Sequence, residues 1–375
     1  MRKLLTVILF FLAFLLQINT SAASNNLIPS QKYYQGVVLK VLENGYKTID
    51  GSKQPYQKLD IKIINGDLNG KQIQVENGGS ISITEGQRVN QGDKVVLTSV
   101  STPIGNTFII TDRYRIGPVI FLILLFIAIA VITAGKRGIT SIIGLFVGVF
   151  IITNFMVPQI LAGSNPAIIS YIAVLLIAVS SLYLAHGFNR NTSLALISTL
   201  ITLLVSMVLS GIAVNITHLS GAGTDESFFL SANQTISVNL KGLLLGGIIL
   251  GVLGVLDDIT TAQTSVVSEI KGANPRLNLF ELYSKGINVG KEHITSLINT
   301  LFLAYAGASL PLFLLLKLNS YQPLWVTFNS EFIIEEVVRT LVGSIALILA
   351  VPLSTFIAAY YYENKKVSVH DGHHH

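Results

Sequence analysis

Long apolar stretches separated by short polar ones dominate the chain from residue 117 onward. A helix needs about 20 residues to cross the roughly 30 Å hydrocarbon core of a bilayer, and these stretches have that length. The pattern predicts seven transmembrane helices, at 117–135, 138–160, 166–186, 193–216, 239–262, 293–317 and 333–361. Residues 117–362 are therefore expected to form an all-α membrane bundle, followed by a cytoplasmic tail at 363–375.

The first 23 residues have the layout of a secretory signal peptide. Arg2 and Lys3 precede an apolar run from Leu4 to Leu16, and small residues follow at Ala22 and Ala23. Cleavage is expected after Ala23. An uncleaved anchor helix is the alternative, and both readings leave the next segment on the outer side of the membrane.

Residues 24–116 predict a small extracytoplasmic β domain. Strands are expected at 36–42, 59–63, 73–75, 94–99 and 107–112, where apolar and polar side chains alternate or β-formers gather. Asn65-Gly66 and Asn69-Gly70 supply turn residues that tolerate positive φ angles. Five strands fit a small all-β barrel of OB or SH3 type, and the periodicity is compatible with both. The segment has no metal-ligand spacing and no nucleophile constellation, which favours a docking or sensing module.

Basic residues in the short loops orient the predicted helices. With the β domain outside, the first helix runs inward and places Lys136 and Arg137 in the cytoplasm. Arg190 and the basic residues from Lys271 to Lys291 then fall on the same side, in agreement with the positive-inside rule. The expected localisation is a bacterial cell (plasma) membrane, with several passes and a cytoplasmic C-terminus.

Composition supports a membrane protein and excludes several classes of function. Apolar residues make up 51% of the chain and charged residues 12%. The formal charge of +5 is carried mostly in the loops, so it indicates topology and not nucleic-acid binding. The chain has no cysteine, which excludes disulfides, thiolate nucleophiles and cysteine-based zinc sites. It also lacks Walker A, His-Glu-x-x-His and Gly-x-Ser-x-Gly patterns, so neither an enzyme activity nor a cofactor is expected.

Two adjacent aspartates, Asp257 and Asp258, end the apolar, glycine-rich fifth helix. An aspartate near the hydrocarbon costs roughly 2.5 to 3.5 kcal/mol on insertion scales, so it marks a functional site by default. Asp258 shares a helix face with Gly247, Gly251 and Gly254, and this face is expected to be buried against a neighbouring helix. Asp257 lies about 100° round the helix, on a stripe of hydroxyl groups. The alternative is a pair of interfacial residues facing cytoplasmic water.

The sixth predicted helix opens with polar residues at the same depth. Histidine, here His293, is the residue type used in proton relays, Asn299 both donates and accepts hydrogen bonds, and carboxylates and hydroxyls are hard oxygen ligands. Together these groups suit a relay of protons or metal cations, although a lone histidine at a helix start is also commonly a cap. The candidate site between the two helices comprises Asp257, Asp258, Thr260, Thr261, Gln263, His293, Ser296 and Asn299. The intervening residues 271–292 are expected to form the longest inner loop, as a connector or a short interfacial helix.

Two further clusters are weaker candidates. Glu335, Glu336 and Arg339 lie at the outer start of the last helix, where acidic side chains favour the helix N-terminus. Glu335 and Arg339 are spaced for an i, i+4 ion pair, so capping explains most of this cluster. The histidines at 370–375 could bind a borderline metal, but a disordered tail or an appended tag explains them equally well.

With these residues in place, the chain resembles the YibE/F family of bacterial membrane proteins. The resemblance rests on Leu256–Gln263, on Lys291–Ile294 and on Asn299–Pro311, and it extends over roughly residues 115–362. It implies a multi-spanning membrane protein behind an extracytoplasmic domain. The family brings no settled biochemical activity, so the resemblance assigns no catalytic residue.

Three classes of function compete. A secondary transporter or channel for a small solute or ion explains polar residues at one depth on two helices rich in small residues. A non-transporting scaffold or sensor, whose β domain binds an envelope partner, is the second hypothesis. An intramembrane hydrolase is disfavoured, because carboxylates about 100° apart on one helix make a poor aspartyl dyad. The expected partners are the bilayer, a small solute or ion and an envelope protein; homo-oligomers are compatible with the sequence, and nucleic acid is not expected.

Overall fold

The computed structural model describes residues 32–49, 52–79, 81–102, 105–232, 238–308, 310–311, 314, 317 and 322–365. They form two compact units, a β unit and a helical unit, whose boundary falls within one helix between Ile129 and Ala130. The expected signal at 1–23 and the histidines at 370–375 lie outside the described residues.

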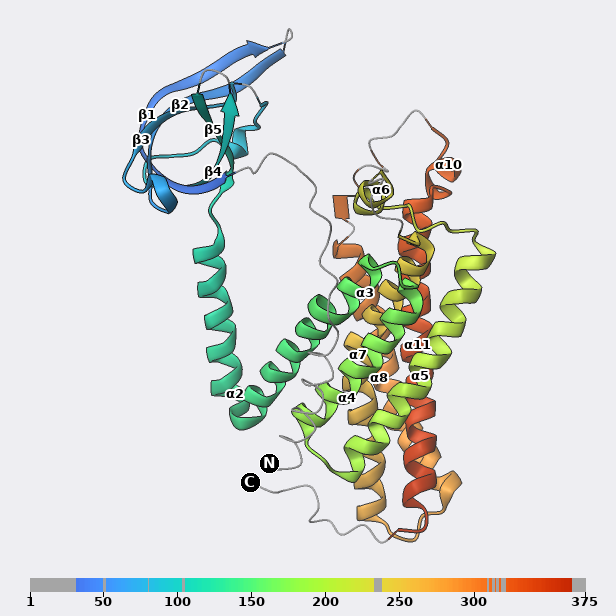
Figure 1. Cartoon of the computed structure of the whole chain (residues 1–375). Helices are drawn as coiled ribbons and strands as arrows, with labels where there is room; N and C mark the ends of the chain where they lie inside the picture. The colour runs from blue at the N-terminus through green and yellow to red at the C-terminus, as the bar shows by residue number, and fades with distance from the viewer. Residues whose placement is uncertain are drawn as a thin grey trace. The chain divides into compact units, whose positions relative to one another are not determined.

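The β unit is an antiparallel sheet of five strands (Figure 1). The strands are β1 (Lys32–Ile49), β2 (Ser52–Ile63), β3 (Gln72–Asn77), β4 (Lys94–Thr102) and β5 (Gly105–Arg113). They lie in the order β3-β2-β1-β4-β5, and the sheet curves so that its two edge strands approach each other. The expectation of a small all-β domain is confirmed, and its OB or SH3 type stays a prediction.

Alternating side chains build the core of the β unit. Leu59, Ile61 and Ile63 of β2 are fully buried against side chains of β1 and β4, as the alternation in the sequence predicts. Gly66 and Gly70, in the turn after β2, have φ angles of +71° and +88°. These are left-handed conformations that glycine adopts without steric cost, so the predicted turn is confirmed.

The helical unit consists of long helices joined by short connections (Figure 1). α2 begins in the β unit and continues into the helical unit. In chain order the elements are α2 (Ile116–Ile151), a π-helical turn (Ile152–Met156), α3 (Val157–Leu161), α4 (Pro166–His186), α5 (Arg190–Ile216), α6 (Asp225–Ala232), α7 (Leu240–Ala273), α8 (Leu279–Ala308), α10 (Leu324–Phe328) and α11 (Glu331–Tyr362).

Five helical segments among the described residues are long and apolar enough to cross a membrane. They are Ile116–Leu161, Pro166–His186, Arg190–Ile216, Leu240–Ala273 and Glu331–Tyr362. Gly135 interrupts the first, 46-residue segment with non-helical φ and ψ angles of 56° and −133°. The interruption lies where the sequence predicts one helix to end, at 135, and the next to begin, at 138. The described part of α8 does not meet the same criterion, so the count of seven spans stays a prediction.

α7 occupies the centre of the helical unit, in contact with α4, α5, α8 and α11. Ile248, Ile249 and Leu256 of α7 are buried in the same apolar core as Leu347 of α11. Polar side chains on the buried face of α7 therefore meet side chains from several helices at once.

Residues 271–292, expected to be the longest inner loop, are mostly helical. α7 continues to Ala273 and α8 begins at Leu279, so only the turn 274–278 separates them. The connector alternative was wrong, and the helix alternative holds from Leu279 onward but as the start of a long helix. Val267 and Leu282 pack in a second apolar cluster, which extends the bundle beyond the continuous apolar stretches. Buried Lys271 closes the turn, since its Nζ donates to the carbonyls of Leu277 and Glu363 at 2.8 Å each.

Candidate functional site

α7 buries a different face from the one that the glycine spacing predicts. Asp258 and Gly254 are exposed, and a Cβ added at Gly247 or Gly254 would meet no described atom within 4 Å. The close approach of α4 uses Gly242 and Gly246 instead. The prediction of a buried Asp258 face is therefore wrong, because small residues occur on both sides of α7 and spacing alone does not say which side meets a neighbour. The buried positions near the aspartates are Leu256, Ile259, Thr260, Gln263 and Thr264.

Asp257 lies at the contact between α7 and α4. Ser181 of α4 donates its hydroxyl to Asp257 Oδ2 at 2.5 Å. The other carboxylate oxygen, Oδ1, is buried and has no hydrogen-bond partner among the described residues. An unpaired buried acceptor costs about 1–3 kcal/mol, and more when it is charged. Asp257 Oδ1 is thus a group that a proton or a cation would stabilise.

Asp258 belongs to a different, exposed polar group. His186, at the C-terminal end of α4, lies within electrostatic range of both Asp258 and Arg137. Arg137 follows the interruption of α2 at Gly135. These three side chains come from α2, α4 and α7, and the sequence analysis did not bring them together.

Thr260 connects α7 with α5. Its hydroxyl is fully buried, donates to Leu256 O at 3.0 Å and lies 2.8 Å from Thr199 Oγ1. Thr261, half-buried one position on, donates to Asp257 O at 2.7 Å. Thr261 therefore donates within its own helix, whereas Thr260 also reaches a neighbouring one, with either Thr199 or Thr260 as the donor of the contact between them.

Gln263 connects α7 with α8 and α11. Its Nε2 donates to Gly286 O of α8 at 2.8 Å and to Thr355 Oγ1 of α11 at 2.7 Å. The side chain is buried among these helices. Gln263 was a predicted site residue, whereas its partners at 286 and 355 were not.

His293, Ser296 and Asn299 of α8 are exposed. No hydrogen bond or ion pair among the described residues joins them to Asp257 or Asp258. α8 instead buries Leu282, Gly286 and Gly290, and these positions fix the side of the helix that meets α7 and α11. The facing arrangement of the fifth and sixth helices, as the sequence analysis placed it, is not formed. His293 and Ser296 line a surface hollow whose other described residues are Asn288, Val289 and Glu292, all on α8.

A row of hydroxyl groups runs along the buried side of α5 and was missed from the sequence. We call Ser198, Thr202, Ser206 and Ser210 the hydroxyl row; all four are fully buried. Each donates to the carbonyl four residues earlier, at 2.6 to 2.8 Å. The signal was present in the printed sequence, as hydroxyl residues repeated every four positions.

Glu335 and Glu331 of α11 hold the loop between α5 and α6. Buried Glu335 accepts the Gly223 N–H at 3.0 Å. Glu331 Oε1 accepts the N–H and hydroxyl of Ser220, at 2.5 and 2.7 Å, and the Gly221 N–H at 3.1 Å. These carboxylates satisfy backbone donors of a loop, which is a structural role.

Arg339 pairs with Glu336, at 3.5 Å, and not with Glu335 as the i, i+4 spacing predicts. The reason is that the Glu335 carboxylate is turned toward the loop at Gly223. Among the described residues, no group of three His, Cys, Asp or Glu side chains is arranged to hold a metal ion.

Comparison with known proteins gives one match. The family model for YibE/F-like proteins matches residues 122–364, which is more than half of the chain. The comparison with curated proteins found no match, and the comparison with solved structures found none either.

Proposed function

The chain belongs to the YibE/F-like family, and we propose that its helical unit carries a small cation, or a solute that donates hydrogen bonds, across the membrane. The proposed path follows the hydroxyl row of α5 and the buried polar side chains of α7 and α11. Five apolar helical segments support a membrane location for this unit.

The observation that carries the proposal is that the buried hydroxyls have already used their protons. A hydroxyl has one proton and two lone pairs, and each member of the hydroxyl row donates its proton within α5. Only acceptor lone pairs remain. From Ser198 to Ser210 the row covers about 18 Å at 1.5 Å per residue, more than half of a hydrocarbon core of about 30 Å. An acceptor-lined interior suits a cation or a hydrogen-bond donor and disfavours an anion.

Asp257 supplies the negative charge in this proposal. Its unpaired Oδ1 is available to a proton or cation, while Ser181 fixes Oδ2. Ionisable residues that face the interior of a membrane bundle commonly mark ion pathways. The Nζ of Lys271, buried at the end of α7, donates to two carbonyl oxygens at the turn.

The proposed topology has seven spans, with the β unit outside and the C-terminus in the cytoplasm. The two parts of the segment 116–161, divided at Gly135, count as two spans, and α8 counts as one. Lys136 and Arg137 next to this division, and Arg190 at the start of α5, then lie on the cytoplasmic side, as the positive-inside rule requires.

A non-transporting scaffold is the second candidate, and one observation favours it. His293, Ser296 and Asn299 do not meet the aspartates, so the polar site predicted between the fifth and sixth helices is not formed. In that case the hydroxyl row serves packing only, because small back-bonded residues let membrane helices approach closely.

Adjacent aspartates provide a matched pair of variants for the test. Proteoliposomes containing the full chain would be assayed for proton flux with internal pyranine and for ²²Na⁺ and ⁸⁶Rb⁺ uptake. We expect flux above protein-free liposomes for at least one cation. Asp257→Asn should reduce it at least about tenfold, since a charged hydrogen-bond acceptor is worth roughly 1.5–3 kcal/mol. Asp258→Asn should leave it nearly unchanged.

Two results would contradict the proposal. Equal effects of Asp257→Asn and Asp258→Asn on the flux would show that Asp257 does not line the path. Absence of flux for all three cations, from protein that is monodisperse and correctly inserted, would favour the scaffold.

A further inference from the structure

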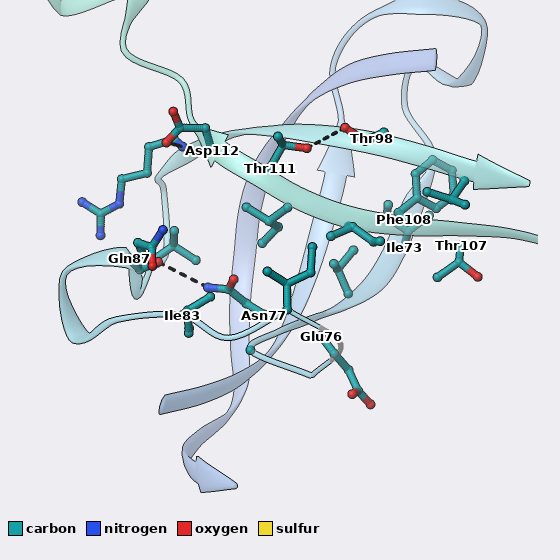
Figure 2. A pocket seen from close by; sticks show the side chains of 18 of the residues that line it. Ile73, Glu76, Asn77, Ile83, Gln87, Thr98, Thr107, Phe108, Thr111 and Asp112 are labelled. Carbon is teal, nitrogen blue, oxygen red and sulfur yellow. Dashed lines mark hydrogen bonds between the residues drawn. The ribbon is translucent and has the colours of Figure 1, made fainter. Parts of the chain in front are cut away.

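A groove of about 860 Å³ opens in the β unit between β3 and β5 (Figure 2). Every residue from Ile73 to Gly78 and every residue from Thr107 to Arg113 lines it. Successive residues of a strand point to opposite faces of the sheet. A groove on one face of the sheet would be lined by every second residue of a strand. This groove is lined by consecutive residues, so it follows the edges of the two strands, where main-chain groups are accessible.

Both walls of the groove are free strand edges. β3 pairs only with β2, and β5 pairs only with β4, so these strands end the sheet on its two sides. Among the described residues no ladder of hydrogen bonds joins β3 to β5. A free edge presents a row of unused N–H and C=O groups, which is a template for another strand.

Three polar side chains of the groove make hydrogen bonds within the β unit. Thr98 and Thr111 share a hydrogen bond at 2.5 Å (Figure 2). Asn77 Nδ2 donates to Gln87 O at 3.3 Å, and Asn77 lies on the opposite wall (Figure 2). These contacts use the hydroxyl groups of Thr98 and Thr111 and the amide of Asn77.

The charges at the groove are close to balanced. Asp112 pairs with Arg115 at 2.7 Å, and Arg113 lies 3.8 Å from Asp93. The remaining charged lining residues, Lys71 and Glu76, have opposite signs. This balance favours an uncharged occupant over an ion, a nucleic acid or a strongly charged peptide.

Apolar side chains complete the lining. Val75 and Val89 are buried at its base, and Ile81 is 56% exposed at the groove. Figure 2 places Ile73, Ile83 and Phe108 around the same space. An occupant with apolar side chains at alternate positions would cover these residues while its backbone meets the strand edges.

We propose that this groove binds an extended, uncharged peptide segment of a partner protein as an added strand along β5. A polypeptide backbone offers donors and acceptors at the spacing of the free edge of β5, in the mode known as β-strand addition. The seven residues of β5 that line the groove extend about 23 Å, which is long enough to pair with a peptide strand of about seven residues. The volume lies in the range of known ligand sites, about 300–1,000 Å³. This inference does not rest on the proposed transport.

The test uses the full chain in nanodiscs and a fluorescein-labelled, end-capped peptide of sequence Thr-Val-Thr-Val-Thr-Val-Thr. Two control peptides carry the same side chains with N-methyl groups on the odd or on the even residues. Each control removes the donors along one edge of the peptide. We expect saturable binding of the unmodified peptide by fluorescence anisotropy, and at least about tenfold weaker binding of one or both controls, which is about 1.4 kcal/mol.

A pair of protein variants locates the binding. Ile81→Trp places a large side chain at the groove, whereas Leu42→Trp changes an exposed aliphatic residue of β1 that does not line it. We expect Ile81→Trp to weaken peptide binding at least about tenfold and Leu42→Trp to leave it unchanged. Equal thermal unfolding of both variants would show that the fold is retained.

Several outcomes would overturn the proposal. They are absence of saturable binding up to about 1 mM peptide, equal binding of methylated and unmodified peptides, and equal binding by the two tryptophan variants. Peptide binding that appears only after deletion of residues 24–31 would assign the groove to the chain's own N-terminal segment. Binding that competes with self-association of the protein would assign it to a second copy.

Discussion

Gln263 is the residue through which three helices of the bundle share hydrogen bonds. Its amide donates from α7 to a main-chain oxygen of α8 and to a hydroxyl of α11. Gly286 lets this contact form, because a Cβ there would lie 2.7 Å from Thr355 Cγ2 and 3.0 Å from Val267 Cγ2. One polar side chain thus fixes the relative positions of helices that otherwise meet through non-directional apolar contacts.

Replacement of Gln263 by leucine is expected to destabilise the helical unit. Gln263→Leu has a similar size but loses both donated hydrogen bonds, and Gly286 O loses this partner while buried. We expect the free energy of unfolding to fall by about 1–3 kcal/mol, measured by thermal unfolding in detergent. Gln159→Leu is the control, because the Gln159 side chain has one hydrogen bond among the described residues, in which its Oε1 accepts from the Ser164 hydroxyl at the long distance of 3.4 Å. A similar loss in both variants would contradict a special role for Gln263.

Sequence reasoning named Asp257 and Gln263 of α7 but not the residues that they contact. The 100° separation of Asp257 and Asp258 follows from helix geometry, and the two side chains do lie in different surroundings. That Ser181 would meet Asp257 does not follow, because it depends on the position of α4. His293 was placed opposite the aspartates only because it was expected at the same depth in the membrane. The rotation of α8 about its own axis, which Leu282 and Gly286 fix by packing, does not follow from that depth.

At the scale of helices, contact between α7 and α4 depends on glycine at particular positions. Gly246 is buried, and a Cβ there would lie against Ser170, 2.6 Å from its Cβ. Gly247, the next residue, has no described atom within 4 Å of the corresponding position. Of these two adjacent glycines, Gly246 is therefore needed for helix packing, whereas Gly247 has no described neighbour.

Alanine substitutions should separate these roles. Gly246→Ala forces α4 away from α7, and overpacking of this kind typically costs about 1–3 kcal/mol. Gly247→Ala adds a methyl group in open space and should stabilise the helix by about 0.5–1 kcal/mol, because glycine is the poorer helix former. Thermal unfolding of the two variants in detergent gives the comparison. Destabilisation by Gly247→Ala would indicate a neighbour on that face, such as a second copy or another part of the chain.

The hydrophobic pattern predicted the existence of the elements better than their ends. It located the interruption at Gly135, because a glycine and two basic residues break the apolar run there. It ended the fifth helix too early and began the sixth too late, since residues 271–292 are amphipathic and not continuously apolar. Burial of Lys271 and Leu282 against other helices stabilises those helical turns, and such tertiary contacts leave only a weak signal in a single sequence.

At the scale of the whole molecule, the chain combines two units with separate cores. The β unit buries Val38, Leu59 and Leu97 in its own cluster, and the main core of the helical unit starts only at Val174. The family match, at 122–364, covers the helical unit and leaves the β strands outside it.

Deletion of residues 32–113 should therefore remove peptide binding and preserve transport. Because the described core clusters of the helical unit contain no residue of the β strands, its packing is expected to survive the deletion. We expect cation flux in proteoliposomes within about twofold of the full chain, a change of less than about 0.5 kcal/mol in the barrier. Asp257→Asn in the shortened chain should again reduce that flux at least about tenfold. A shortened protein that remains monodisperse and inserted but carries no cation would show that the β unit is part of the transport path.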